Sequence, residues 1–534
     1  SVLVSIVGYF FLIGKYGIRV GDGQSVAIDS VYIELVDSLA GVDVGAGIRI
    51  LRGSGNTVRH AKIRGTQGPA ILIDTTSNVI VASNDVAGRQ RLVLVRASTT
   101  ATIQSNQFDT RPLGLNGEVF SAGTLLEWAA LELTSSWQAI VASNTFRDVA
   151  DQQPFNAMRF VAVKNPSFPS QPGAQVLNNS ILGTRAGVRS QGSTLTIQGS
   201  RFDSTMVGII GTGNDTWTLL NDTITITLQN ACVRATSATS VTLTASLFQL
   251  CTARSPHAVA TSGGTLRVQQ STFVDNRAAI GASGTSVTAI GNSIDGAGFN
   301  PLPGDTLVAE AAIEAVAQTV AIVQNTLTGH AFNAGVRVQG GQASAQLDSN
   351  FISTNATGVR LGSVGNFSAL DNDIFDNVAA GVVNEAGSSE SLPQTWWGDG
   401  RGPRGSADPA ATGDSVIGNV IPCAWSTAPH VSGSPAAASR RVRGNAQTAP
   451  RGTVLPKAFT VRVVDAAGRP VAGVQVTFRV GVGGGSIGAS QVSVDTDASG
   501  LAEVTLTLGP NPGPNTVTAT VSGLPTLTFT ATGT

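Results

Sequence analysis

The stretch Ile103-Gln-Ser-Asn106-Gln-Phe108 is one copy of a phrase that recurs along most of this chain. The phrase consists of an apolar residue, two residues, a small polar residue, one residue and an apolar residue. Other clear copies begin at Val141, Ile322 and Leu347, and the pattern ends near residue 375. Most successive copies start 21 to 25 residues apart. A fixed period of this length predicts a solenoid, in which neighbouring repeats bury a core that no single repeat could bury alone.

The fourth place of the phrase is most often Asn. Two apolar residues five apart fit neither a strand's period nor a helix's, so the phrase predicts two short strands joined by a bend at the fourth place. Asn tolerates the left-handed backbone that a sharp bend needs, and we expect it at Asn144, Asn325 and Asn350. Stacked Asn side chains are also predicted to form a structural hydrogen-bonded ladder. Its members are Asn84, Asn106, Asn144, Asn179, Asn292, Asn325, Asn350 and Asn372, with Ser200, Asp222, Ser246 and Ser271 at the same place in other copies.

A third element precedes most phrases by nine to eleven residues. It is a small residue followed by a β-branched one, as in Gly187-Val188 and Gly335-Val336. Three strands per turn of about 22 residues predict a three-sided parallel β-helix of about 15 rungs, with inward apolar side chains stacked in columns. We expect the outward strand positions to be mostly Thr, Ser, Gln, Ala and Val.

These repeats resemble the right-handed parallel β-helix repeats of pectate-lyase-like and related bacterial surface proteins. The resemblance covers roughly residues 1–425 and implies the fold, but it implies little about function, because the same coil carries lyases, hydrolases, phage spikes and inert stalks. Trp396-Trp397-Gly398 and Gly402-Pro403 resemble the ending common after such repeats. We therefore assign residues 1–395 to the β-helix and 396–425 to a cap, in which Trp396 and Trp397 cover the last rung.

Residues 426–443 are expected to be a linker rich in Ser, Ala, Gly and Pro. From 444 to 534, short alternating strands and frequent turn signals predict a β-sandwich. Val464-Asp-Ala-Ala-Gly-Arg-Pro-Val-Ala-Gly473 and Thr496-Asp-Ala-Ser-Gly500 resemble the bacterial immunoglobulin-like domain of the invasin and intimin type. That resemblance implies a rigid spacer, export and a cell-surface or extracellular location. The complete fold class is thus all-β, a right-handed three-sided parallel β-helix followed by an immunoglobulin-like sandwich.

Composition narrows the function classes. Charged residues are 13% of the chain and the formal net charge is −1, so there is no electrostatic case for nucleic acid. Cys232 and Cys251 either form a disulfide in an exported protein or pack as two small buried hydrophobes. The apolar run Val2–Ile13 is too short for a membrane span and fits a coil turn without a cap. We therefore expect the natural chain to extend upstream.

Two successive rungs carry additional residues at one corner, at 109–129 and 147–159. Solenoids bind through insertions on one face, which favours a ligand or glycan patch; the alternative is a set of loops that shield the flank of the coil or pack on a neighbour. The patch residues are Glu118, Phe120, Glu127 and Trp128. The catalytic candidates are Arg147, Asp148 and Asp151. The four histidines are far apart in the repeat, so no metal site is expected, and calcium has no support.

The sequence favours a non-enzymatic bacterial cell-surface or extracellular protein with a structural or adhesive role, as part of a larger chain or assembly. Its rigid β-helix is carried on an immunoglobulin-like stalk. The alternative is an extracellular polysaccharide lyase or glycoside hydrolase with its site in the loops at 109–159. The expected partners are proteins or further copies at the cell surface, with glycans as additional candidates. We expect no cofactor, no nucleic acid and no membrane span.

Overall fold

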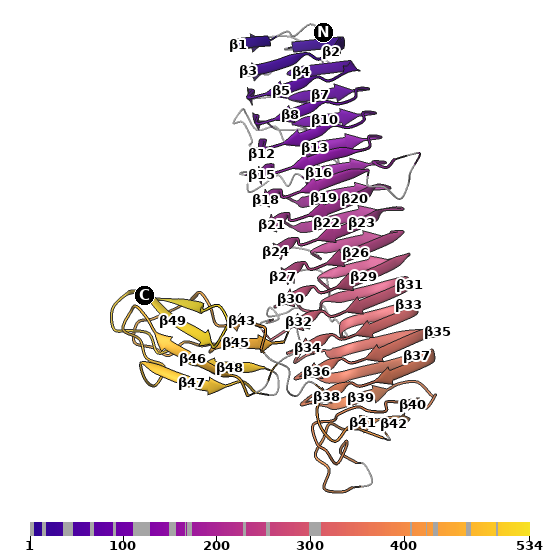
Figure 1. Ribbon diagram of the computed structural model, residues 1–534, viewed down its shortest axis with the longest axis vertical. Coiled ribbons are helices and arrows are strands. Elements are labelled where there is room, and N and C mark those ends of the chain that lie inside the picture. Colours follow the sequence, from indigo (N-terminus) through magenta and orange to yellow (C-terminus); the bar gives the residue numbers. More distant parts are fainter. Residues whose placement is uncertain are drawn as a thin grey trace, which may run out of the picture. The chain divides into compact units, whose positions relative to one another are not determined.

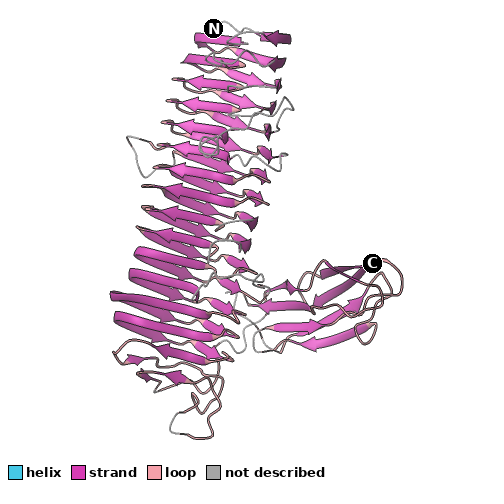
Figure 2. Ribbon diagram, turned by 180° about the vertical axis from the view of Figure 1, so that it is seen from behind, coloured by secondary structure: helices cyan, strands magenta, loops and turns pink. Residues whose placement is uncertain are grey.

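The computed structural model of this chain consists of strands and loops, and the described residues contain no helix (Figure 2). The structure describes residues 5–12, 18–35, 46–64, 69–88, 92–110, 129–148, 156–165, 167, 173–227, 231–251, 257–297, 299, 311–405, 408–422, 424–430, 436–465, 471, 473–497 and 500–534. Unit 1 comprises Ser1–Arg267 and Ala282–Thr285, and unit 2 comprises Val268–Gly281 and Ser286–Thr534. The predicted all-β class is confirmed.

Unit 1 is a coil in which most rungs contribute one strand to each of three parallel sheets (Figure 1). The first sheet contains β2 (Ile18–Gln24), β4 (Ile48–Ser54), β7 (Ile71–Asp74), β10 (Val93–Arg96), β13 (Ala129–Thr134), β16 (Asn156–Val161), β19 (Ala186–Gln191), β22 (Val207–Thr212), β25 (Val233–Thr236) and β28 (Val259–Ser262). The second contains β5 (Thr57–Arg59), β8 (Ile80–Ala82), β11 (Thr102–Gln104), β14 (Ala139–Ala142), β17 (Ala174–Leu177), β20 (Thr194–Gln198), β23 (Thr216–Leu220) and β26 (Ser240–Thr244). The third contains β6 (Lys62–Arg64), β9 (Asp85–Ala87), β12 (Gln107–Thr110), β15 (Thr145–Asp148), β18 (Ser180–Leu182), β21 (Arg201–Asp203), β24 (Thr223–Thr227) and β27 (Leu247–Cys251). Near the N-terminus, β3 (Ala27–Leu35) pairs with β1 (Ser5–Leu12) and with both β5 and β6.

Inward side chains stack in columns along the coil. The inward column of the third sheet is at most 1% exposed and consists of Ile63, Val86, Phe108, Phe146, Ile181, Phe202, Ile224 and Phe248. Consecutive rings lie in contact, as the 4.9 Å between the centroids of Phe108 and Phe146 shows. The small residue before Val188 follows from this packing, since a Cβ on Gly187 would lie 2.2 Å from the Phe202 ring.

The bend between the second and third sheets differs from the prediction by one residue. The left-handed residues are Ser143, Gln324 and Ser349, with φ of 54°, 57° and 54°, and each directly precedes a ladder Asn. The expectation of left-handed backbone at Asn144, Asn325 and Asn350 was therefore wrong. The Asn side chains are buried and occupied by hydrogen bonds, whereas the preceding residue takes the strained conformation on the outside of the bend.

The ladder itself runs through buried amides on successive rungs. In unit 1, Asn84 Nδ2 donates to Asn106 Oδ1 at 2.9 Å, and Asn106 Nδ2 donates to Asn144 Oδ1 at 2.9 Å. Each amide also donates to a main-chain oxygen of the preceding rung, as Asn106 does to Val81. In unit 2, equivalent bonds join Asn292, Asn325, Asn350 and Asn372. Because every polar atom of these side chains is used, the ladder fixes the register of the coil.

The rungs of unit 2 contain one long strand and one short strand in place of three short strands. Its long strands are β33 (Ala311–Val323), β35 (Ala334–Asp348) and β37 (Thr357–Leu370), followed by β39 (Ala380–Asn384). Its short strands are β30 (Thr272–Val274), β32 (Ser293–Asp295), β34 (Thr326–Thr328), β36 (Phe351–Ser353) and β38 (Asp373–Phe375). The strands β29 (Thr265–Gln269) and β31 (Ile280–Ile290) contain residues of both units. In these rungs one long strand covers the length that two strands cover in unit 1.

The segment after the last rung packs on it as a cap. Trp397 is fully buried, and the Trp396 ring lies 4.7 Å from that of Phe375. Strand β41 (Val416–Ile417) pairs with β39, and β40 (Glu390–Ser391) pairs with β42 (Val420–Ile421). Asp414 Oδ2 accepts hydrogen bonds from the main-chain N and the Nδ2 of Asn377, at 3.0 and 2.8 Å. The cap thus covers the apolar layer and satisfies the polar groups of the rung beneath it.

The C-terminal region is a sandwich of two sheets. One contains β43 (Ala438–Arg443), β45 (Phe459–Val464) and β48 (Leu501–Val504). The other contains β44 (Gln447–Ala449), β50 (Leu527–Gly533), β49 (Gly513–Val521), β46 (Gln475–Val480) and β47 (Gln491–Asp495). Phe459 and Phe529 stack across the core with centroids 4.8 Å apart. Strand β43 lies inside the segment expected to be a linker, so the linker ends earlier than predicted.

Candidate binding surface

One outward column of the first sheet differs from the rest of the surface. In register along unit 1 its members are Arg19, Arg49, Leu72, Leu94, Glu132, Arg159, Arg189, Ile210, Arg234 and Ala260. The residues on either side of each arginine are buried, so the arginines point away from the core. We call this row of ten positions, with its five arginines, the arginine column. The arginines occupy half of the ten positions in a chain that is only 13% charged.

The other two sheets have no such column. The matching outward column of the second sheet is uncharged and consists of Thr57, Ile80, Thr102, Ile140, Gln175, Thr196, Thr218 and Thr242. The third sheet mixes both signs, as in the pair Arg201 and Asp203 at 3.0 Å. The expectation of Thr, Ser, Gln, Ala and Val at outward positions therefore describes the second sheet well but was wrong for the first.

Two arginines of this column lie next to each other. Arg159 and Arg189 are register partners on adjacent rungs. Arg185 lies just before β19 and outside the column, and burial, followed by the charge of Arg189, lowers its pKa.

One carboxylate stands within the arginine column. Glu132 Oε1 lies 3.0 Å from Arg159 Nη1, and the two side chains are only 6% and 13% exposed. At this burial the pair is well shielded from salt. In unit 2, Arg337 pairs with Glu314 at 3.4 Å, and Arg360 pairs with Glu385.

Most of the residues expected to form a ligand patch lie outside the described residues: Glu118, Phe120, Glu127, Trp128 and Asp151. Arg147 is exposed on β15, where its register partners are Asp109 and Leu182. Asp148 is the last residue of the same strand, and its side chain is not described. Among the described residues, the carboxylate in register with Arg147 is thus that of Asp109.

Within the described ranges, no group of three or more His, Cys, Asp or Glu side chains is arranged to hold a metal ion. Two aspartates are nevertheless buried inside the coil. Asp222 stands at a ladder place and accepts from the main-chain N of Ser200 at 2.7 Å, and burial raises its pKa to about 7. Asp215 accepts from Ser190 Oγ at 2.6 Å, and burial raises its pKa also. Neither faces solvent, so both serve the coil rather than a site.

A second ladder, which the sequence analysis missed, runs along the corner between the first and second sheets. Ser98 Oγ accepts from the main-chain N of Thr76 at 3.2 Å, and Ser136 Oγ accepts from that of Ser98 at 3.2 Å. Asp215 Oδ1 takes this role for Ser193, at 2.9 Å. The signal was a buried Thr or Ser eight residues before Asn84, Asn106 and Asn144, and a buried Ser or Asp seven residues before Ser200 and Asp222, which is hard to separate from ordinary polar turns.

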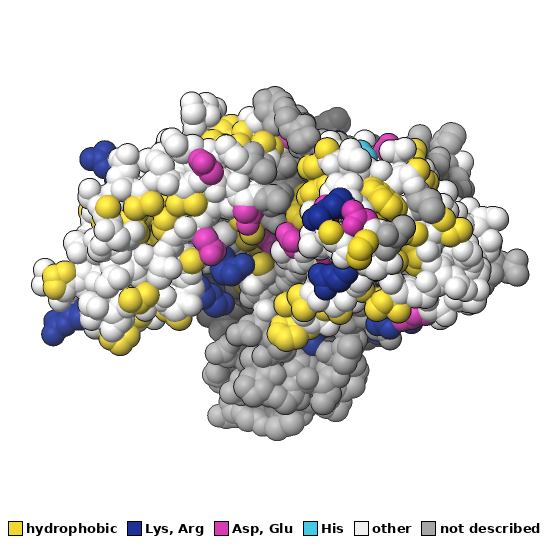
Figure 3. Space-filling view, turned by 90° about the horizontal axis from the view of Figure 1, so that it is seen from below, with side chains coloured by type: hydrophobic (Ala, Val, Ile, Leu, Met, Phe, Trp, Pro, Cys, Tyr) yellow, Lys and Arg dark blue, Asp and Glu magenta, His cyan; other side chains and the backbone are white. Residues whose placement is uncertain are grey.

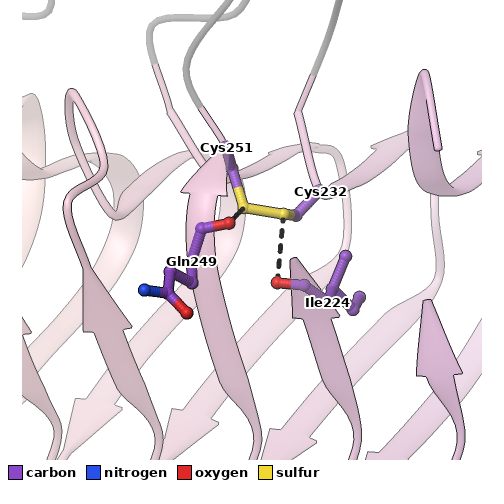
Figure 4. The surroundings of a disulfide bond; sticks show 4 residues. All are labelled: Ile224, Cys232, Gln249 and Cys251. Atoms are coloured by element: carbon purple, nitrogen blue, oxygen red, sulfur yellow. Dashed lines mark hydrogen bonds between the residues drawn. A yellow bond between two sulfur atoms is a disulfide. The ribbon is translucent and has the colours of Figure 1, made fainter. Parts of the chain in front are cut away.

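Cys232 and Cys251 form a disulfide, with their Cα atoms 5.5 Å apart (Figure 4). Both are fully buried, and Cys251 ends β27. The bond closes a sequence separation of 19 residues. A disulfide of this kind is typical of an exported protein. The described residues contain no helix long and apolar enough to cross a membrane.

Two family models match this chain. Residues 6–146 match the right-handed β-helix region, and residues 455–534 match the bacterial Ig-like domain (group 1). The chain therefore contains a right-handed β-helix and a bacterial immunoglobulin-like domain, which confirms the predicted fold class. Among curated proteins, none matches this sequence.

Solved structures with similar parts include PfbA, a surface adhesin of Streptococcus pneumoniae, at 11% identity over 71% of this chain and 83% of that one, with a TM-score of 0.31. A tailspike protein of E. coli bacteriophage HK620, solved with a pentasaccharide, is 10% identical over 99% of this chain and 86% of that one, with a TM-score of 0.38. A β-glucuronidase of Parabacteroides merdae is 19% identical over 22% of this chain but only 14% of its own, with a TM-score of 0.15. Likeness at this level carries no argument about activity.

Proposed function

We propose that this protein is a non-enzymatic bacterial cell-surface or extracellular protein, in which the β-helix is a rigid structural or adhesive element and the immunoglobulin-like domain is a spacer. The observation that carries the proposal is the presence of both domains in one chain. The buried disulfide supports an extracellular location, since such bonds persist in oxidising compartments.

The charged groups on the surface also support a role in binding rather than in catalysis. Charged side chains are few and scattered among uncharged ones on the face shown in Figure 3. On the first sheet, one outward column is rich in arginines, which bind anions well but do not act as general bases because they remain protonated. Glu132, the carboxylate in that column, is already engaged by Arg159.

The alternative function is a polysaccharide lyase or glycoside hydrolase with its site at 109–159. Glu132 and Arg159 lie within these residues and form an ion pair on the first sheet, which is why the alternative needs a direct test. The purified chain is incubated with acidic and neutral polysaccharides, with and without calcium, and the length of the polysaccharide is followed by size-exclusion chromatography. We expect no shortening. Cleavage that is lost in Asp148→Asn or Asp151→Asn would overturn the non-enzymatic proposal.

Location and assembly are tested on cells of the source organism. Antibody labelling of intact cells and protease shaving should both detect the chain, and permeabilising the cells should add little signal. The mass of the purified chain in solution should exceed that of a monomer, because we propose that it acts within a larger assembly. Detection only after the cells are permeabilised would contradict the surface location.

A further inference from the structure

We propose that the arginine column of unit 1 binds an anionic polysaccharide laid along the coil axis across successive rungs of the first sheet. This inference rests on the proposed extracellular function and names the class of ligand that the surface takes. Arg19 and Arg234 are the exposed arginines of the column, and Arg189 is half-buried. Arg19 and Arg49 extend the same line toward the N-terminus.

The spacing of the column fits an extended polymer. Arg159 and Arg189 lie on adjacent rungs, and Ile210 separates Arg189 from Arg234. At ~4.8 Å between neighbouring strands, consecutive arginines are roughly 5 or 10 Å apart within each of the two groups, Arg19 with Arg49 and Arg159 to Arg234. Four strand spacings, about 19 Å, separate Arg49 from Arg159. A chain with anionic groups at regular intervals can therefore contact several guanidinium groups at once, and each added contact raises the overall affinity.

The chemistry of the column favours carboxylate or sulfate groups. A guanidinium donates two parallel hydrogen bonds to such an oxyanion, which a lysine ammonium cannot do. The column contains arginine and no lysine, although it reaches over ten strands.

A nucleic acid is the less favoured polyanion. Surfaces for single-stranded nucleic acid combine basic groups with aromatic side chains on which the bases stack. The uncharged members of the column are Leu72, Leu94, Ile210 and Ala260, and none is aromatic. The net charge of −1 also provides no long-range attraction for a duplex. We therefore assign the surface to a polysaccharide.

The test uses the full chain and four labelled probes: a heparin oligosaccharide, an oligogalacturonate, a neutral dextran oligomer and an oligothymidylate. The test variant is Arg189→Gln with Arg234→Gln. The control variant, Arg59→Gln with Arg201→Gln, removes two exposed arginines from the second and third sheets. Circular dichroism and thermal unfolding establish that both variants keep the fold. Affinity is measured over a series of salt concentrations.

We expect the wild-type chain and the control to bind at least one of the two acidic oligosaccharides and to ignore dextran. The test variant should lose about tenfold in affinity per arginine, and its dependence on salt should fall by about two charges. If the double variant does not fold, the single variant Arg234→Gln, at an exposed position, provides the same comparison.

Three results would overturn the inference: no binding of either acidic oligosaccharide, equal losses in the test and control variants, or binding of the oligothymidylate alone. The length of the bound probe is measured in the same samples. Shortened probes would contradict the non-enzymatic proposed function, whereas intact and unbound probes would contradict only the arginine column as a binding site. The two failures are thus distinguishable.

Discussion

Glu132 Oε1 lies 3.0 Å from Arg159 Nη1 on the next rung, and this pair divides the arginine column into two stretches. The carboxylate competes with any external anion for Arg159. Glu132→Gln should therefore raise the affinity for an acidic oligosaccharide about three- to tenfold, since the amide keeps a hydrogen-bond acceptor but removes the charge. Titration of wild type and variant with the same probe measures the change. Glu385→Gln, on unit 2, serves as the control and should leave the affinity unchanged.

Asp222 makes the stability of the coil depend on pH. Burial raises its pKa from the ordinary value of 3.8 to about 7, so folding favours the protonated acid. The stabilisation is complete below about pH 4 and is lost as the pH rises to about 7. Asp222→Asn should therefore raise the free energy of unfolding at pH 8 by roughly 2–4 kcal/mol and change it little at pH 4.

Urea unfolding at both pH values measures this difference. Asp22→Asn, at a side chain that is 66% exposed, is the matched control and should show no such dependence. An Asp222→Asn chain that is less stable than wild type at pH 8 would show that the ladder needs the carboxylate at this rung.

Asn325 tests the ladder independently of the bend. Its Oδ1 accepts from the Nδ2 of Asn292 at 2.9 Å, and its own Nδ2 donates to the Ala289 oxygen at 2.8 Å. Asn325→Val leaves these buried groups without partners and should cost roughly 3 kcal/mol or more in unfolding free energy. Gln324→Gly, at φ 57°, should stay within about 1 kcal/mol of wild type. A larger change in unfolding free energy for Gln324→Gly than for Asn325→Val would show that backbone strain at the bend matters more to stability than the ladder.

The difference between these two neighbours shows how far the sequence could predict the fold. The periodic apolar residues predicted three stacked sheets, and the recurrence of Asn predicted a ladder, because both patterns repeat in the sequence. The pattern did not show which residue bends, since the strained position tolerates Ser, Gln and Gly alike. Asn144 was therefore assigned a strained backbone that belongs to Ser143.

The arginine column was missed for a related reason. Its members occupy the same place on successive rungs, but the number of residues between them varies along the sequence. Glu132 and Arg159 are 27 residues apart, whereas most copies of the phrase start 21 to 25 residues apart. Register across the first sheet was needed to align them. The expected patch drew attention to the longer rungs instead, and its four residues and the catalytic candidate Asp151 lie outside the described residues.

The two tryptophans of the cap should differ in their importance. Trp397 is fully buried beside Gly381, and a Cβ on that glycine would lie 3.2 Å from the indole. Trp396 is half-buried and packs on Phe375. Trp397→Ala should lower the free energy of unfolding by roughly 3–5 kcal/mol, and Trp396→Ala by less. Chemical denaturation of the full chain measures both; equal and small effects would contradict the role of Trp397 in covering the last rung.

The disulfide predicts the number of free thiols among residues 1–534. The chain has three cysteines, and Cys232 and Cys251 are joined, so the denatured but unreduced protein should expose one reactive thiol. Reduction should raise this number to three and lower the unfolding free energy by roughly 3 kcal/mol. Free thiols at Cys232 and Cys251 in protein taken from its source would contradict both the bond and the extracellular location.

Arginine footprinting tests the central claim, a binding surface on the first sheet, most directly. The full chain is modified with phenylglyoxal with and without a saturating acidic oligosaccharide, and each arginine is followed by mass spectrometry. The account predicts that the ligand protects Arg189 and Arg234, while Arg201, whose side chain is 60% exposed on the third sheet, reacts at an unchanged rate. Protection of Arg201, with Arg189 and Arg234 unaffected, would contradict it.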